Sequence, residues 1–316
     1  MQCSGFVSAI FSVSGLRITA VAWQHMFRVM VIMEMAVRLF LKLIKPRWIT
    51  LKKKCVRPEN FGAINKMTSW SGNILSYNNA KTVKGEKSGI LTSIWYGAPN
   101  TTSGYDACPN SSPGCRDVCL FYSGFGAMRR TQNARIRKTK LFFENRRDFH
   151  NLLAGDISSF VLFSKKMNMQ PCFRLDGTTD LGLGKRYAKK YPDLQFYDYT
   201  KSFNRIMGNF VSNWHLTYSL SENTTKEQLG ILLASTHNIA IPFRTAPPPG
   251  SVLWGRRVVS GDEDDLRFKD PDSCIVSLLA KGPAKRRGGA FVLDDIKAAA
   301  TRPRLVLDRF DKSCML

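Results

Sequence analysis

The chain has 316 residues, of which 44% are hydrophobic and 11% are aromatic. This content is too high for a disordered chain, and the length allows one large domain or two small ones with a hydrophobic core. The 47 Lys and Arg residues outnumber the 24 Asp and Glu residues, which gives a formal net charge of +23. Such a charge favours acidic partners: nucleic acid, anionic lipid, or phosphorylated and carboxylated small molecules.

Residues 1–66 form a basic segment that holds 11 Lys and Arg residues against Glu34 and Glu59. In residues 26–44, charged residues interrupt every apolar run before it reaches the roughly 18–20 residues that a bilayer span needs. We therefore expect no membrane span and no secretory signal. The expected extension is either poorly ordered or a basic amphipathic helix on a partner or a membrane surface. A core-covering helix and a true start at Met67 are the alternatives.

Residues 67–87 have a more typical globular composition and form a lead-in to a β–α rhythm. Helical patterns at residues 130–163, 184–191 and 225–235 separate several apolar, β-prone runs. This alternation predicts an α/β domain over residues 88–295 with a mostly parallel sheet, either open or closed into a barrel, followed by a C-terminal tail, 296–316. The expected strands are 89–97, 172–176, 194–200, 214–220, 238–243, 256–261 and 274–280.

The loop 104–122 carries the most specific signal, because Cys108, Cys115 and Cys119 lie within it among prolines and glycines. A loop of this kind can wrap its thiolates around a metal ion or cluster. Three thiolates without an obvious fourth ligand favour a [4Fe–4S] cluster with an open coordination position. A zinc site completed by His150 or Cys172 and three incidental free thiols remain as alternatives.

Polar side chains follow five of the expected strands at their C-terminal ends. In parallel-sheet enzymes this edge holds the chemistry, since the connecting loops converge there. The ordinary alternative is that these residues cap helices and form turns. As a set they predict a pocket, and the candidate binding residues are Asp176, Asp180, Tyr199, Lys201, Ser219 and Asp262.

Two segments, residues 129–147 and 281–287, are rich in Lys and Arg. Such runs are either solvated faces or contacts to phosphate backbones. No helix-turn-helix, zinc-finger pair or ribonucleoprotein motif accompanies them, so a nucleic-acid partner is expected without sequence specificity. The acidic run 262–265 suits either a hard cation or an ion-paired turn with the basic residues that follow it.

A cysteine-rich loop directly after the first strand of a β–α domain resembles the arrangement in radical S-adenosylmethionine (SAM) enzymes. The spacing Cys108-x6-Cys115-x3-Cys119, with Ser-Pro-Gly before the second cysteine, is longer than the commonest spacing of those enzymes and resembles phage-associated proteins of radical-SAM type. Residues 88–295 also resemble a family of uncharacterised bacteriophage proteins. This second resemblance rests on three phrases, which span residues 174–180, 197–201 and 261–267.

The radical-SAM resemblance implies a partial (β/α) barrel in which the three cysteines hold a [4Fe–4S] cluster. One iron of that cluster is free for the amino and carboxylate groups of SAM. A reduced cluster of this type donates an electron to SAM, and the resulting 5′-deoxyadenosyl radical abstracts a substrate hydrogen. The residues at the strand ends would then anchor the ribose, the carboxylate and the substrate.

We therefore expect a phage-encoded, radical-SAM-like iron–sulfur enzyme in the cytoplasm of the host cell. Its substrate is unknown and is expected to be anionic or related to nucleic acid. Two alternatives come from other classes of protein. One is a nucleic-acid-binding protein with structural zinc, and the other is a non-catalytic phage interaction protein.

Overall fold

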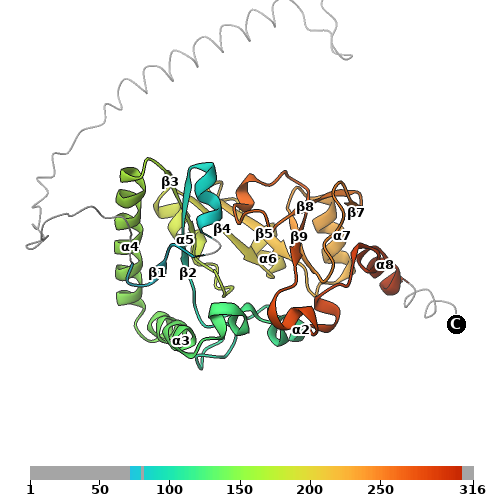
Figure 1. Cartoon of the computed structure of the whole chain (residues 1–316), viewed down its shortest axis with the longest axis horizontal. Helices are drawn as coiled ribbons and strands as arrows, with labels where there is room; N and C mark the ends of the chain where they lie inside the picture. Colours follow the sequence, from blue (N-terminus) through green and yellow to red (C-terminus); the bar gives the residue numbers. More distant parts are fainter. Residues whose placement is uncertain (1–71, 80–81, 308–316) are drawn as a thin grey trace, which may run out of the picture. The chain divides into compact units, whose positions relative to one another are not determined.

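A computed structural model of the chain describes residues 72–79 and 82–307 (Figure 1). The predicted N-terminal extension 1–66 lies outside these residues, as do residues 308–316 of the predicted tail. Within the described part, no helix is long and apolar enough to cross a bilayer.

A nine-stranded sheet forms the centre of the described part, in the order β1-β2-β3-β4-β5-β6-β9-β8-β7. All neighbouring pairs from β2 to β8 are parallel, whereas β1 and β7 pair antiparallel at the two edges. The seven expected strands coincide with the parallel ones, because apolar runs bounded by turn residues suit strands that are buried on both faces. The strands are β1 (Leu75–Ser76), β2 (Ile90–Trp95), β3 (Gln170–Arg174), β4 (Gln195–Thr200), β5 (Trp214–Ser219), β6 (Ile239–Phe243), β7 (Val252–Leu253), β8 (Arg256–Ser260) and β9 (Ile275–Leu279).

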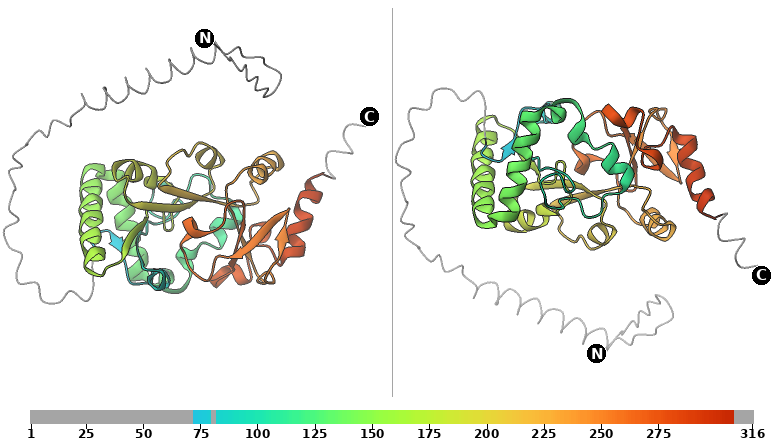
Figure 2. Two further views of the ribbon diagram at one scale, coloured as in Figure 1. Left: turned by 90° about the horizontal axis from the view of Figure 1, so that it is seen from above. Right: turned by 90° about the horizontal axis from the view of Figure 1, so that it is seen from below.

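Helices connect most of the parallel strands. In Figures 1 and 2, α3 and α4 lie together beside the β2–β3 end of the sheet, while β7, β8 and α8 lie at the other end. The α-helices are α2 (Pro113–Asp117), α3 (Arg129–Glu144), α4 (Arg146–Lys166), α5 (Leu183–Lys190), α6 (Phe203–Met207), α7 (Lys226–Ala234) and α8 (Ile296–Leu307). The 3-10 helices are η1 (Val83–Ser88), η2 (Leu120–Tyr122), η3 (Gly124–Ala127), η4 (Arg267–Lys269), η5 (Gly282–Lys285) and η6 (Gly289–Phe291).

The single helical stretch expected at residues 130–163 is divided into α3 and α4 at Asn145. The backbone of Asn145 leaves the helical region, with φ of −137° and ψ of 71°, and its side-chain oxygen accepts the N–H of Asp148 at 3.3 Å. Asparagine is a favoured N-cap because its short side chain satisfies a free N–H at the start of a helix. The apolar pattern continues across this break, so periodicity alone does not reveal it.

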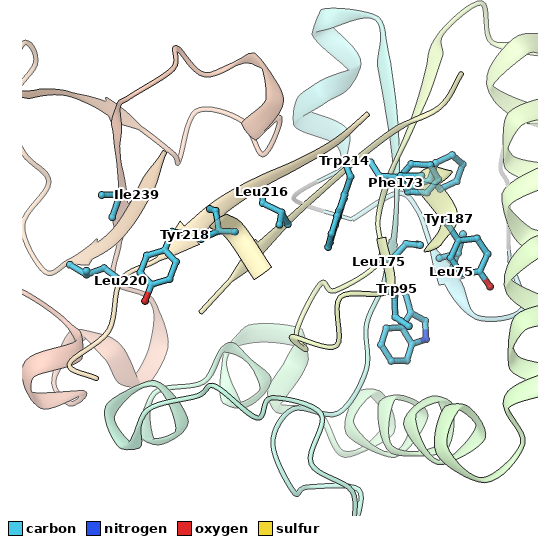
Figure 3. Close-up of a cluster of buried hydrophobic side chains, with 14 of the residues drawn as sticks. Leu75, Trp95, Phe173, Leu175, Tyr187, Trp214, Leu216, Tyr218, Leu220 and Ile239 are labelled. Atoms are coloured by element: carbon cyan, nitrogen blue, oxygen red, sulfur yellow. The ribbon is translucent and has the colours of Figure 1, made fainter. Parts of the chain in front are cut away.

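The main core lies between the sheet and its covering helices, and Figure 3 shows part of it along the strands. Trp95 of β2 packs edge-on against Phe149 of α4, with ring centroids 5.4 Å apart. Phe173 of β3 makes a similar contact with Phe160, at 5.6 Å. All four side chains are fully buried. Each buried aromatic side chain contributes about 2–3 kcal/mol through removal of apolar surface from water.

On the opposite face of the sheet, the segment 261–270, which follows β8, packs over β2, β3 and β4. Leu266 of this segment packs against Tyr197 of β4, and Lys84 of η1 donates a hydrogen bond to the carbonyl oxygen of Asp262. The strand order runs from β1 to β7 without a pairing that would close the sheet within residues 72–79 and 82–307. The predicted α/β class and mostly parallel sheet are therefore confirmed, whereas the partial barrel stays a prediction.

Candidate functional site

A cavity of about 1490 Å³ opens at the C-terminal ends of the parallel strands. This is the edge at which the loops after β2, β3, β4, β5 and β8 meet. The structure brings all nine predicted site residues to this one cavity: Cys108, Cys115, Cys119, Asp176, Asp180, Tyr199, Lys201, Ser219 and Asp262. Their roles toward a metal cluster or a cofactor stay predictions.

The cysteine loop is ordered by short-range hydrogen bonds rather than by long elements. The N–H of Cys108 donates to the carboxylate of Asp106 at 2.9 Å, and its thiol lies 3.8 Å from the carbonyl oxygen of Thr178. Ser112 caps the short helix α2, because its hydroxyl oxygen accepts the N–H of Cys115 at 3.3 Å. A proline occupies the first turn of α2, where its missing N–H costs nothing.

Glu222, in the loop after β5, fastens α2 to the rim of the sheet. Its two carboxylate oxygens accept the hydroxyl of Ser112 at 2.7 Å and the N–H of Gly114 at 2.6 Å. A side chain at position 114 would meet the carbonyl oxygen of Gly288 at 2.6 Å, so the loop approaches its neighbour as closely as glycine allows. Glu222 is therefore a positioning residue for the cysteine loop, and it was not among the predicted site residues.

Burial dominates the electrostatic environment of the Cys108 and Cys119 thiols. The pKa of Cys108 is raised to about 12, chiefly by burial, which outweighs the lowering effect of a backbone hydrogen bond with Asn100. Burial also raises the pKa of Cys119, which the positive charges of Arg135 and Lys201 oppose. In the metal-free chain Cys108 and Cys119 are therefore protonated at neutral pH, and a bound metal would have to displace their protons.

The donor set and the size of the cavity suit an iron–sulfur cluster, but the sulfurs are not gathered around a common centre. No three His, Cys, Asp or Glu side chains within residues 72–79 and 82–307 lie close enough to hold a metal ion. Cys172 and His150, the two candidates for a fourth zinc ligand, are hydrogen-bonded to other side chains. Cys172 lies 3.1 Å from the hydroxyl of Thr92, and His150 lies 2.8 Å from the hydroxyl of Tyr187. Neither side chain lines the cavity.

Asp176 organises the loop between β3 and α5. It is buried, and both of its oxygens are occupied by donors from the loop. Because a carboxylate with several N–H donors is already satisfied, we assign Asp176 a structural part in the wall of the cavity. The donors are the hydroxyl of Thr179 at 2.6 Å and the backbone N–H groups of Leu181 at 2.9 Å, Gly182 at 2.8 Å and Leu183 at 3.0 Å.

Asp180 is likewise engaged with the protein. It forms an ion pair with Arg205 and accepts the hydroxyl of Thr200 at 2.9 Å and the N–H of Lys201 at 3.0 Å. Burial raises the pKa of Asp180, and the guanidinium of Arg205 opposes that shift. The carboxylate thus ties the end of β4 to the preceding loop and presents Lys201 to the cavity.

Tyr199 and Lys201 offer a ring and a cation to the cavity. The guanidinium of Arg174 lies 4.8 Å from the centre of the Tyr199 ring, and burial raises the pKa of Tyr199. The ammonium of Lys201 donates to the hydroxyl of Ser219 at 2.6 Å and lies 4.8 Å from the centre of the Phe291 ring. Lys201 can therefore attract an anionic group, and the hydrogen bond to Ser219 fixes the position of the Lys201 ammonium.

The acidic run 262–265 is an ion-paired turn, which is one of the two possibilities that its sequence left open. Burial would raise the pKa of Asp262, but the hydrogen bonds from Lys281 and from the N–H of Leu279, together with the nearby positive charges, hold that pKa below its usual value. Three of the four carboxylates have a basic partner. The pairs are Asp262–Lys281 at 2.6 Å, Asp264–Arg267 at 3.1 Å and Asp265–Arg174 at 2.9 Å.

Arg135 and Tyr96 line the cavity without having been predicted as site residues. The guanidinium of Arg135 lies 4.9 Å from the centre of the Tyr96 ring and 5.8 Å from that of Phe121. Burial lowers the pKa of Arg135 and raises the pKa of Tyr96 to about 12. The sequence marks residues 129–147 as basic but does not show which of these side chains face the cavity. The orientation of α3 places Arg135 there, whereas several of its basic neighbours are exposed.

A family model described as Gene product 88 matches residues 73–295. The match spans well over half of the chain and the whole of the sheet. It agrees with the resemblance to a bacteriophage family over residues 88–295. No curated protein and no solved structure matches the chain significantly.

Proposed function

The chain belongs to the Gene product 88 family, and we propose that this member is a radical-SAM-like iron–sulfur enzyme. Cys108, Cys115 and Cys119 would hold the [4Fe–4S] cluster. One observation carries the proposal: three thiols from one loop line a single large cavity at the C-terminal edge of a mostly parallel sheet. That edge is where parallel-sheet enzymes place their cofactors.

Binding requires the sulfurs to move closer together. The loop is suited to this movement, because its only regular elements are the five-residue helix α2 and the three-residue 3-10 helix η2. The positive charges of Arg135 and Lys201 favour the thiolate of Cys119, which lowers the cost of losing its proton. Glu222 holds the middle of the loop while its ends adjust.

The other residues of the cavity would bind and orient the cofactor and the substrate. A cluster with SAM supplies a carbon radical that abstracts hydrogen from a substrate. Lys201 and Ser219 would hold an anionic group such as a carboxylate, and Tyr96 and Tyr199 provide rings against which a planar group can pack. The roof formed by residues 261–270 would limit the access of water to this side.

The test is the iron, sulfide and zinc content of the full chain, purified without oxygen, together with its visible spectrum. We expect about four irons and four sulfides per chain. The triple variant Cys108→Ala/Cys115→Ala/Cys119→Ala should lose them, whereas Cys274→Ala should keep them, because Cys274 is buried away from the cavity.

Other outcomes would decide against the proposal. One zinc per chain would favour a nucleic-acid-binding protein with structural zinc. A chain that binds no metal and is indifferent to the triple substitution would favour a non-catalytic interaction protein.

A further inference from the structure

The segment 120–128, which begins at the C-terminal end of the cysteine loop, exposes large apolar side chains at the mouth of the cavity. The side chain of Phe125 is 81% exposed and that of Tyr122 is 48% exposed. Both residues also line the cavity. Phe125 lies in the short 3-10 helix η3, which begins at Gly124 with a φ of +50°. Aromatic rings held in water beside a cavity are typical of a binding surface.

Basic side chains surround these rings. The segment 281–287 packs against the segment 120–128, since a side-chain carbon on Gly282 would overlap Ser123. Arg287 pairs with Asp117 of α2 at 3.5 Å, which holds the same segment against the cysteine loop. The exposed basic residues of this rim are Arg116, Arg129, Arg130, Lys285, Arg286 and Arg287.

Most of this positive charge is not neutralised by the protein. Within residues 72–79 and 82–307, the ion pairs found include Arg287 but none of Arg116, Arg130, Lys285 and Arg286. The two segments that the sequence marks as basic, 129–147 and 281–287, thus meet at one rim with two exposed aromatic rings between them. We call the exposed side chains of residues 116–130 and 281–287, which do not include Cys119, the rim surface.

We propose that the rim surface binds single-stranded nucleic acid and leads one unpaired nucleotide into the cavity. Rings such as Tyr122 and Phe125 stack on bases of any sequence, and the Lys and Arg side chains contact the phosphates between those bases. An anionic lipid surface would also fit exposed rings and positive charge, but it has no use for a cavity of about 1490 Å³ directly behind them. A nucleotide would fill such a cavity, because an unstacked base binds in a pocket.

This inference rests on the proposed function in one respect, since the bound strand would deliver the substrate to the three cysteines. Binding itself does not depend on a cluster. The triple cysteine variant should therefore bind an oligonucleotide as the unmodified chain does. If the cluster is absent and the strand binds, only the enzyme proposal fails; if the cluster is present and no strand binds, only the rim inference fails.

The experiment measures fluorescence anisotropy of a labelled single-stranded DNA and RNA of about 15 nucleotides with the full chain at several salt concentrations. We expect Phe125→Ala to weaken binding roughly tenfold through the loss of one stacking contact. The matched control is Phe210→Ala, which removes a 91% exposed phenylalanine from the loop before β5, at the opposite edge of the sheet. This control should change nothing.

A second comparison tests the basic residues by measuring the salt dependence of binding for two double variants. Lys285→Ala/Arg286→Ala should lower the slope of log affinity against log salt by about 1.4, since each lost phosphate contact removes about 0.7. Lys165→Ala/Lys166→Ala removes two exposed charges at the far end of α4 and should leave the slope nearly unchanged. Equal effects of the rim and control variants would overturn the inference. So would binding to anionic vesicles, lost in Phe125→Ala, without binding to either oligonucleotide.

Discussion

His215 makes the stability of the fold sensitive to mild acid. It lies on β5 between Trp214 and Leu216, which face the main core, so its ring points to the opposite face of the sheet. Its Nε2 atom is buried, and no hydrogen-bond partner is found for it within residues 72–79 and 82–307. Burial lowers the pKa of His215 to about 4; Asp272 opposes this shift, whereas Arg267 adds to it.

The unfolded chain binds the proton of this histidine near pH 6.5, whereas the folded chain binds it near pH 4. The unfolded state therefore carries more protons between these values, and stability must fall as the pH falls through this window. Between pH 7 and pH 5, we expect the free energy of unfolding of the unmodified chain to fall by about 2 kcal/mol more than that of the His215→Gln variant. Urea unfolding at the two pH values measures this difference. Parallel losses in the two proteins would contradict this assignment.

At the level of single residues, the sequence predicts which polar residues lie at the edge of the sheet. It predicts their hydrogen-bond and ion-pair partners less well. Polar side chains after buried strands must meet at one edge, so all six candidates and the three cysteines could be placed together. The sequence does not show that Asp180 is paired with Arg205 or that Asp176 is saturated by its own loop. Such pairings depend on loop conformations, which residue type and spacing leave undetermined.

At the scale of elements, the connection between Glu222 and α2 controls the cysteine loop. Loss of a carboxylate that accepts two hydrogen bonds should lower the free energy of local unfolding of α2 by about 1–3 kcal/mol. For Glu222→Ala we therefore expect amide hydrogen exchange of residues 112–119 to accelerate by roughly 5- to 150-fold.

Two matched variants sharpen this prediction. Glu222→Gln keeps an oxygen for the N–H of Gly114, and its amide can donate to the hydroxyl of Ser112, so most of the protection should return. Glu227→Ala removes an exposed carboxylate from the first turn of α7 and should not affect the cysteine loop. Unchanged exchange in Glu222→Ala would show that α2 is held by other contacts.

Elements were predictable where their length gave a pattern and unpredictable where it did not. The parallel strands are each five or six residues long and carry apolar, aromatic or β-branched residues at their centres, and the sequence predicts every one of them. Helix α2 has five residues, too few for a period of 3.6, although Ser112 and Pro113 are good signals for a helix start. The cap at Asn145 was hidden because apolar residues continue on both sides of it.

At the scale of the whole described part, a mostly parallel sheet that pairing does not close needs another element across its open face. The segment 261–270 fills this position, and the buried ion pair between Asp265 and Arg174 fixes it to β3. Arg174 is only 5% exposed and Asp265 only 9%. The hydroxyl of Tyr197 also donates to Asp265 at 3.2 Å, so β3 and β4 are both tied to this segment.

Removal of one partner from a buried ion pair leaves the other charge without compensation in a dry environment. Asp265→Ala should therefore lower the free energy of unfolding by about 3–5 kcal/mol, measured by urea denaturation. Asp294→Ala is the matched control, because Asp294 is the largely exposed partner of Arg244 and its loss should cost at most about 1 kcal/mol. Similar losses in the two variants would mean that water reaches Arg174. The segment 261–270 would then be a loosely attached loop rather than the structural roof of the cavity.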